Sequence, residues 1–198
     1  IQGKFPARFI QRRIVGLIDT ELSDPSQTDA LVTAWGKIYK TEIIRKNQIQ
    51  FTDTKEIGTE DALFNIQYLE YAQTTQVLDM PLYNYVKINA DSLTKLHKPN
   101  LFGQWKNLYA KISEIIHAKD AEFRKALNNR IALSIIGLAL NETFSEKPFS
   151  SKRQKISEIL HDDIYQKAYQ NLEMKYFPLH WKLFFYAAKY KYATWVLS

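Results

Sequence analysis

The stretch AWGKIYKTEIIRKNQIQFTDTKEIGTEDALFNIQYLE, residues 34–70, decides the fold of the first half of the chain. Its last part begins with two neighbouring acids, Glu60 and Asp61, followed by apolar residues that recur with a helical period. This pattern predicts a helix over 60–73, whereas NQIQF at 47–51 is typical of a short strand. The stretch therefore predicts a mixed α and β unit in which a carboxylate pair opens the main helix.

Outside this stretch the patterns are mostly helical. A polar break at 23–28, SDPSQT, precedes a pattern that predicts a helix over 29–45, and residues 75–88 alternate like a strand that Pro81 confines to an edge or a bulge. Further helices are expected at 102–116, 123–140 and 152–161, from Asp162 onward, and at 179–197. We therefore expect an α+β, predominantly α-helical fold, with a mixed part at 1–95 and a helical region at 96–198.

Composition limits the class of protein. Hydrophobic residues make up 45% and charged residues 24% of the 198 positions, which is typical of a globular chain. The net charge of +6 favours an anionic partner, such as a nucleic acid, a lipid surface or a phosphorylated substrate. Because cysteine is absent, disulfides and thiolate sites are excluded, and a reducing, cytoplasmic location is expected.

The apolar segments of the sequence bear on two further features, a signal peptide and a membrane-spanning helix. The chain begins at Ile1, and IQGKFPARFIQRR has neither a continuous apolar core nor a small-residue cleavage site, so it does not resemble a signal peptide. We expect this start to lie inside a longer protein. No uncharged apolar run reaches the ~18 residues that a membrane-spanning helix needs.

Common catalytic and metal motifs are missing. The six glycines form no phosphate-binding pattern, and the four histidines lack the helical spacing that suits zinc. Asp162 and Asp163 are adjacent, so on a helix their side chains diverge by about 100° and do not converge on one atom. Acids at this position favour the positive end of a helix. No metal site is expected within these residues.

Glu60 and Asp61 allow two interpretations. Thr59 can cap the helix, with both acids in its first turn, where they favour the helix dipole. Alternatively, Asp61 takes part in chemistry. Pattern alone leaves both interpretations open.

The order of motifs resembles the acceptor-side half of family 2 glycosyltransferases of the GT-A fold, bacterial enzymes that build capsules, exopolysaccharides and wall glycans. In that family a Trp-x-Lys-x-Tyr segment precedes a strand ending in Phe, a Glu-Asp pair opening a helix, a Tyr-x-Tyr strand and a Ser-x-Thr element. The corresponding residues here are Trp35, Lys37, Tyr39, Phe51, Glu60, Asp61, Phe64, Tyr83, Tyr85, Ser92 and Thr94. The likeness covers about residues 30–95, and a looser one covers 177–192.

The resemblance implies a role for each site residue. Asp61 would be the general base that takes the proton of an acceptor hydroxyl, and Glu60 would support it. The acceptor, a glycan or a lipid-linked sugar, would contact Trp35, Lys37, Tyr83 and Tyr85, although the aromatic residues could equally be part of the core.

The donor-binding half of such enzymes carries an Asp-x-Asp segment that holds Mg²⁺ or Mn²⁺ against the nucleotide-sugar. No Asp-x-Asp occurs in this sequence. The resemblance therefore implies that the cofactors belong to the longer parent enzyme, and that these residues alone lack transferase activity.

The sequence also allows an alternative function, and it indicates one candidate contact surface. The chain could be a helical binding or oligomerisation module for an anionic partner; nucleic acid is not expected, because basic residues alternate with acids, as in KDAEFRK at 119–125. Self-association through exposed apolar surface is expected. On a helical wheel over 179–197, one arc predicts either contact with the inner face of the cell membrane or packing on preceding helices; its members are Trp181, Phe184, Phe185, Ala188, Tyr192, Trp195 and Val196.

Overall fold

A computed structural model describes residues 2–80 and 96–197. Two strands, β1 (Gly3–Pro6) and β2 (Thr74–Val77), accompany a much larger set of helices. The α-helices of the described residues are α1 (Ala7–Val15), α2 (Thr41–Lys46), α3 (Thr54–Ile57), α4 (Glu60–Tyr71), α5 (Leu101–Ile116), α6 (Ala121–Leu133), α7 (Ile135–Thr143), α8 (Phe149–His161), α9 (Asp163–Asn171), α10 (Leu179–Lys189) and α11 (Ala193–Leu197). The short 3₁₀ helices are η1 (Asp19–Ser23), η2 (Pro25–Asp29) and η4 (Met174–Tyr176). The expectation of a predominantly helical α+β fold is confirmed.

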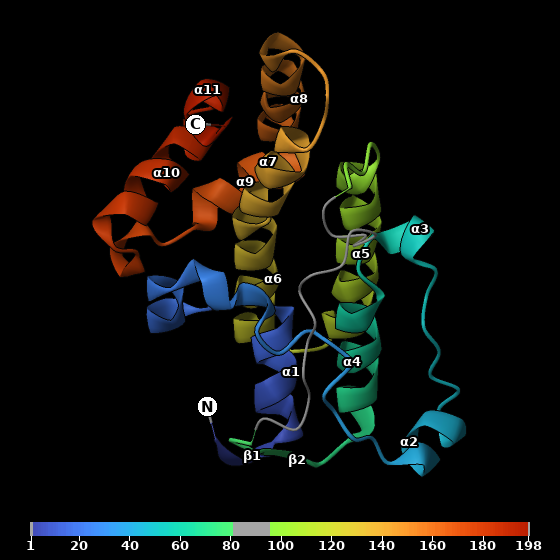
Figure 1. Ribbon diagram of the computed structural model, residues 1–198. Helices are drawn as coiled ribbons and strands as arrows, with labels where there is room; N and C mark the ends of the chain where they lie inside the picture. Colours follow the sequence, from blue (N-terminus) through green and yellow to red (C-terminus); the bar gives the residue numbers. More distant parts are fainter. Residues whose placement is uncertain (1, 81–95, 198) are drawn as a thin grey trace.

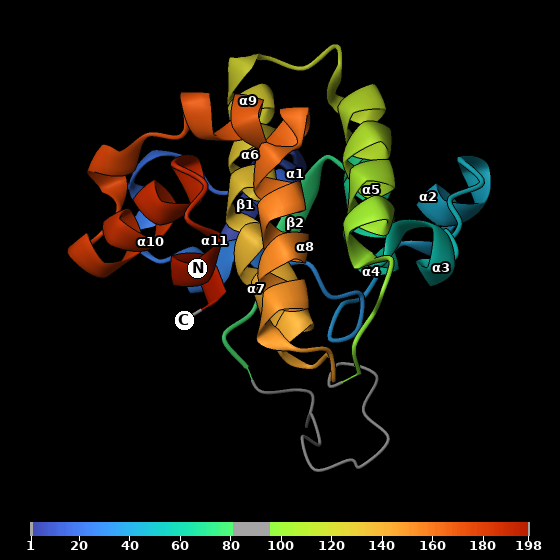
Figure 2. The same cartoon turned by 90° about the horizontal axis from the view of Figure 1, so that it is seen from above.

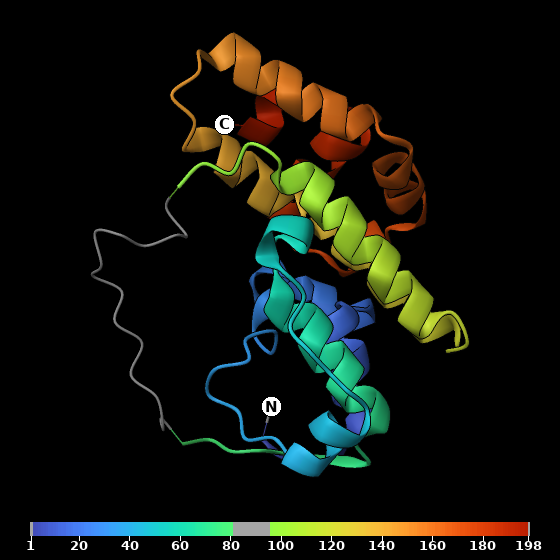
Figure 3. The same cartoon turned by 90° about the vertical axis from the view of Figure 1, so that its right-hand side faces the viewer.

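The helices stack in two connected groups, a first group of α1 to α4 and a second, C-terminal group of α6 to α11, with α5 between them. At the centre α1 packs against α4 and α6, and α5 packs against α4 and α6 (Figure 1). Helices α10 and α11 lie on the side away from α2 and α3, with α6 and α8 between them (Figure 2). In the side view α5 lies between α4 and the helices of the C-terminal group (Figure 3). One continuous apolar core joins both groups. The expected division into a mixed part at 1–95 and a helical region at 96–198 stays a prediction.

The small sheet joins the start of the chain to the end of α4. Strands β1 and β2 are antiparallel, with Gly3 opposite Val77 and Pro6 opposite Thr74. The strand expected over 75–88 is present in its first residues, and its part from 81 to 88 lies outside the described residues. The sequence did not predict β1.

Two expected elements of the first half are wrong. Residues 29–45 do not form one helix, because turns and a bend follow η2 and a helix forms again only at Thr41. Residues 47–51 do not form a strand, because the chain turns at Gln48, whose φ is +51°. Phe51 instead stacks on Phe64 of α4, with ring centroids 4.1 Å apart. A tertiary contact thus replaces the strand pairing that the local pattern favours.

Two long helices expected in the second half are interrupted. The helix expected over 123–140 breaks at Ser134, whose hydroxyl donates to the carbonyl of Ile131 at 2.7 Å. Such local side-chain bonds compete with the helical ladder. The helix expected over 179–197 breaks between α10 and α11, where Lys191 has a φ of +65°.

Buried side chains of α6 complete the C-terminal end of α1. Arg130 donates from Nε to the carbonyl of Val15 at 2.7 Å and from a terminal nitrogen to that of Ile14 at 2.8 Å. Asn129 donates to the carbonyl of Leu17 at 2.8 Å. The last carbonyls of a helix have no partner within it, and leaving them unpaired in a core is costly. These bonds therefore let α1 end inside the protein.

Three phenols on α5 and α9 are buried in the second group of helices, and we predict that they make stability sensitive to alkali. Burial raises the pKa of Tyr109 to about 12, and it raises the pKa of Tyr165 and Tyr169 well above 10. The folded chain therefore retains protons that the unfolded chain releases above pH ~10. The free energy of unfolding should have its full value below pH ~10. As pH rises from ~10 toward 12, it should fall by about 1.4 kcal/mol per pH unit for each phenol.

Urea denaturation at a series of pH values, with phenolate absorbance as a second signal, measures this slope. Tyr169→Phe removes one phenol together with its bond to the carbonyl of Ala132, and should make the slope shallower. A free energy of unfolding that stays constant from pH ~9.5 to ~11.5 would contradict the prediction.

Candidate functional site

The candidate site forms where α3 ends and α4 begins. Gly58 ends α3 with a φ of +73°, and a Cβ atom there would lie 3.0 Å from Cδ1 of Trp105. Thr59 occupies the N-cap position of α4, as expected, but its side chain makes no capping hydrogen bond. Glu60 and Asp61 then open the helix, and both are half-buried. The sequence correctly predicted where this helix begins.

Asn65 fastens the preceding segment to α4. It is buried, accepts a hydrogen bond from the Tyr39 hydroxyl at 2.8 Å, and donates to the carbonyls of Val32 and Asp61, each at 2.8 Å. The Tyr39 ring also meets the edge of Tyr68, with centroids 4.9 Å apart. Sequence analysis did not identify Asn65; the signal was an amide in the apolar run ALFNIQYL, since buried polar groups need partners.

This fastening brings Lys37 and Tyr39 into the electrostatic range of Asp61. Burial lowers the pKa of Lys37, and the charge of Asp61 opposes that shift. Burial also raises the pKa of Tyr39 to about 12, with a further upward contribution from Asp61. Lys37 donates to the carbonyl of Thr33. The structure thus brings Lys37 and Tyr39 within electrostatic range of Asp61.

Asp61 differs from the aspartates that cap helices in this chain. Asp53, Asp120 and Asp162 occupy N-cap positions, and each accepts a backbone hydrogen bond from the second residue after it, at 2.8, 3.1 and 3.0 Å. Asp61 lies inside the first turn, and no described residue donates a hydrogen bond to its carboxylate. Its negative charge can still interact favourably with the dipole of α4, but Asp61 does not cap the helix by hydrogen bonding.

The other expected site residues are Trp35, Glu60, Tyr83 and Tyr85. Trp35 is 46% exposed, and the neighbouring Gly36 has a φ of +74° with open space around the position of a Cβ atom. Glu60 lies beside Asp61 in sequence, about 100° further round the helix axis. Tyr83 and Tyr85 lie outside the described residues. Of the six predicted residues, the structure therefore brings Lys37 into the electrostatic range of Asp61, next to Glu60 at the start of α4.

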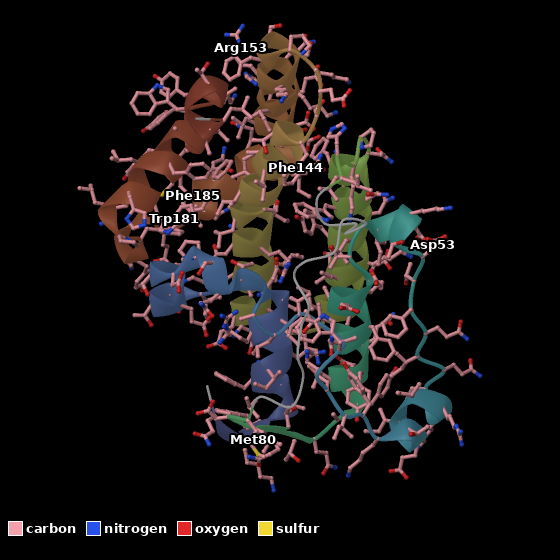
Figure 4. All side chains as sticks on the ribbon, in the orientation of Figure 1. Asp53, Met80, Phe144, Arg153, Trp181 and Phe185 are labelled. Carbon is pink, nitrogen blue, oxygen red and sulfur yellow. The ribbon has the colours of Figure 1, made fainter. Side chains whose placement is uncertain are left out.

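Two open cavities occur elsewhere among the described residues. One, of about 420 Å³, is bounded by the loop at 47–52 and by Gln67, Glu70 and Tyr71 of α4. The other, of about 510 Å³, lies beside His97 and residues 144–147, of which Phe144 is labelled in Figure 4. Neither cavity is lined by Asp61.

Within residues 2–80 and 96–197, no three or more histidine and acidic side chains are grouped so that they could hold a metal ion. In the same part of the chain, no helix combines the length and the apolar character required to cross a bilayer.

Comparisons of the chain with models of protein families, with curated proteins and with solved structures find no match.

Proposed function

We propose that the chain is the acceptor-side part of a glycosyltransferase that moves a sugar from a nucleotide-sugar to a glycan or lipid-linked acceptor in bacterial surface polysaccharide synthesis. One observation carries this proposal: the Asp61 carboxylate accepts no hydrogen bond from the described residues, yet lies in the field of Lys37 and Tyr39. A general base needs a free lone pair on a rigid element. Among the described residues, the position and surroundings of Asp61 are compatible with both requirements.

The proposed step is a displacement at the anomeric carbon. The acceptor oxygen forms a bond to that carbon, the bond to the nucleotide phosphate breaks on the opposite face, and the acceptor proton passes to Asp61. Lys37 places a positive charge close to Asp61, and Trp35 offers an aromatic face to a sugar ring. Glu60 supports the site without reacting. In this proposal the donor and its metal ion are held outside these residues.

The same proposal places the protein in the cytoplasm, at the inner face of the cell membrane. Nucleotide-sugars are cytoplasmic donors, and a lipid-linked acceptor would be presented at the membrane surface. The absence of cysteine from the sequence is compatible with this reducing compartment.

Sugar transfer by the longer parent polypeptide tests the proposal. Radiolabelled nucleotide-sugars of several kinds are incubated with it and with membranes of the native host, and label is counted in the lipid and polysaccharide fractions. We expect transfer by the wild type, and a KM for the acceptor raised about tenfold or more by Trp35→Ala with little change in kcat. Transfer that is unaffected by changes at both Trp35 and Asp61 would contradict the site.

A further inference from the structure

Helix α10 presents an apolar stripe to solvent. Its members recur at helical spacing, so they fall within an arc of about 60° at 100° per residue. They are Leu179, Leu183, Tyr186 and Tyr190, which are 72%, 58%, 41% and 62% exposed. The rings of Tyr186 and Tyr190 stack with centroids 6.2 Å apart. We name these four residues the α10 stripe.

The opposite side of α10 is occupied by packing. Phe185 and Ala188 are fully buried, and Trp181 stacks on Phe185 with centroids 5.8 Å apart. Figure 4 labels Trp181 and Phe185 as neighbours on this helix. Phe185 and Ala188 of the aromatic arc that the sequence singled out therefore hold α10 on the protein, whereas Tyr192 and Trp195, after the end of α10, are 61% and 70% exposed. The α10 stripe is a different face, and Figures 1 and 2 both place α10 at the outer edge of the molecule.

The charges in the sequence around this stripe have one sign. Residues 174–197 contain four lysines and no aspartate or glutamate. Lys182 and Lys189 fall along one edge of the stripe on the helical wheel, and Lys191 follows the end of α10. The nearest acid in sequence, Glu173, is paired with Lys125 and Lys175. The stripe therefore combines exposed apolar area with cations that nearby acids in the sequence do not neutralise.

We propose that the α10 stripe and its lysines bind the surface of an anionic lipid bilayer. Leucine and tyrosine side chains can enter the boundary between headgroups and acyl chains, while lysines extend to lipid phosphates. A second copy of this chain fits less well, because it would bring two sets of lysines together. Nucleic acid also fits less well, because the apolar stripe occupies the centre of the face and the cations one edge.

Co-sedimentation of the 198-residue chain with vesicles tests this proposal. The probe is vesicles of about two parts phosphatidylcholine to one part phosphatidylglycerol, compared with pure phosphatidylcholine, at low and high salt. We expect binding to the anionic vesicles that weakens with salt. Lys182→Gln with Lys189→Gln should weaken it by roughly fivefold per lysine. Leu183→Ser with Tyr186→Ser should weaken it by at least about tenfold.

Matched controls separate this surface from general stickiness. Lys40→Gln with Lys46→Gln removes two exposed lysines elsewhere, and Ile38→Ser removes an apolar side chain that is 98% exposed. Both controls should bind like the wild type, and circular dichroism should show every variant folded.

The proposal would be overturned if the wild type did not bind anionic vesicles at low salt, or if both α10 variants bound them as strongly as the wild type does. It would also be overturned if the chain formed a dimer that dissociates in those variants and no form bound lipid. The proposal does not rest on the glycosyltransferase assignment, and either can fail without the other.

Discussion

Asp61→Asn should lower the turnover number of the proposed transferase by roughly 100-fold or more while leaving its fold intact. The amide keeps nearly the shape of the carboxylate but cannot accept the proton of the acceptor hydroxyl. No described residue bonds to the Asp61 side chain, so the change disturbs no hydrogen bond of the described structure. Steady-state kinetics at saturating donor and acceptor, with thermal unfolding of the same preparation, measure both parts of this prediction.

Glu60→Gln is the matched control for this change. Both acids lie in the first turn of α4, so a role limited to the helix dipole treats them alike. In that case each change should cost no more than about 1 kcal/mol of stability and leave turnover nearly unchanged. Base catalysis instead predicts a large loss in Asp61→Asn and a small one in Glu60→Gln. If the two variants had equal turnover numbers, Asp61 would not be the general base and would have a structural role only.

The largest effect on stability is expected at Gly16. This residue follows α1 where it meets α6, and a Cβ atom there would lie 2.0 Å from the carbonyl oxygen of Ala126. Backbone must therefore move apart, and the bonds from Arg130 to the end of α1 would be strained with it. We expect Gly16→Ala to reduce the free energy of unfolding by roughly 3 kcal/mol, or about 6–12 °C in Tm.

Gly36→Ala provides the comparison for Gly16→Ala. Nothing lies within 4 Å of a Cβ atom at Gly36, but its φ of +74° is unfavourable for alanine. Its cost should be limited to about 1–2 kcal/mol of backbone strain. Thermal unfolding of both variants gives the two values. A Tm of Gly16→Ala within about 2 °C of the wild type would show that α1 and α6 do not approach this closely.

Local pattern predicted those elements whose signals lie in their own residues. The acids at Glu60 and Asp162 mark the starts of α4 and α9 because favourable helix ends depend on nearby charges and caps. The turn at Gln48 and the stacking of Phe51 on Phe64 were missed, because distant packing decides them. The same holds for the end of α1, which depends on Arg130, more than 100 positions away in the sequence.

The candidate site was predictable to a similar degree. The order of motifs led to Lys37 and Asp61, and the structure places both at one end of α4. Asn65, which fastens Tyr39 to that helix, was not identified because its role depends on a fold that the periodicity alone does not specify. For α10 the sequence left packing and membrane contact open, since a helical wheel gives the apolar arc but not what covers it, and the structure buries Phe185 and Ala188 of that arc.

Surface polysaccharide of the native host tests the central claim without knowledge of the donor or the acceptor. Strains carrying Asp61→Asn, Glu60→Gln or a deletion of the gene are compared with the wild type by monosaccharide composition, with the amount of protein measured in each. The account predicts that Asp61→Asn removes the same sugar as the deletion while the protein accumulates normally, and that Glu60→Gln retains that sugar. A wild-type composition in the Asp61→Asn strain, or a deletion strain with unchanged polysaccharide, would contradict it.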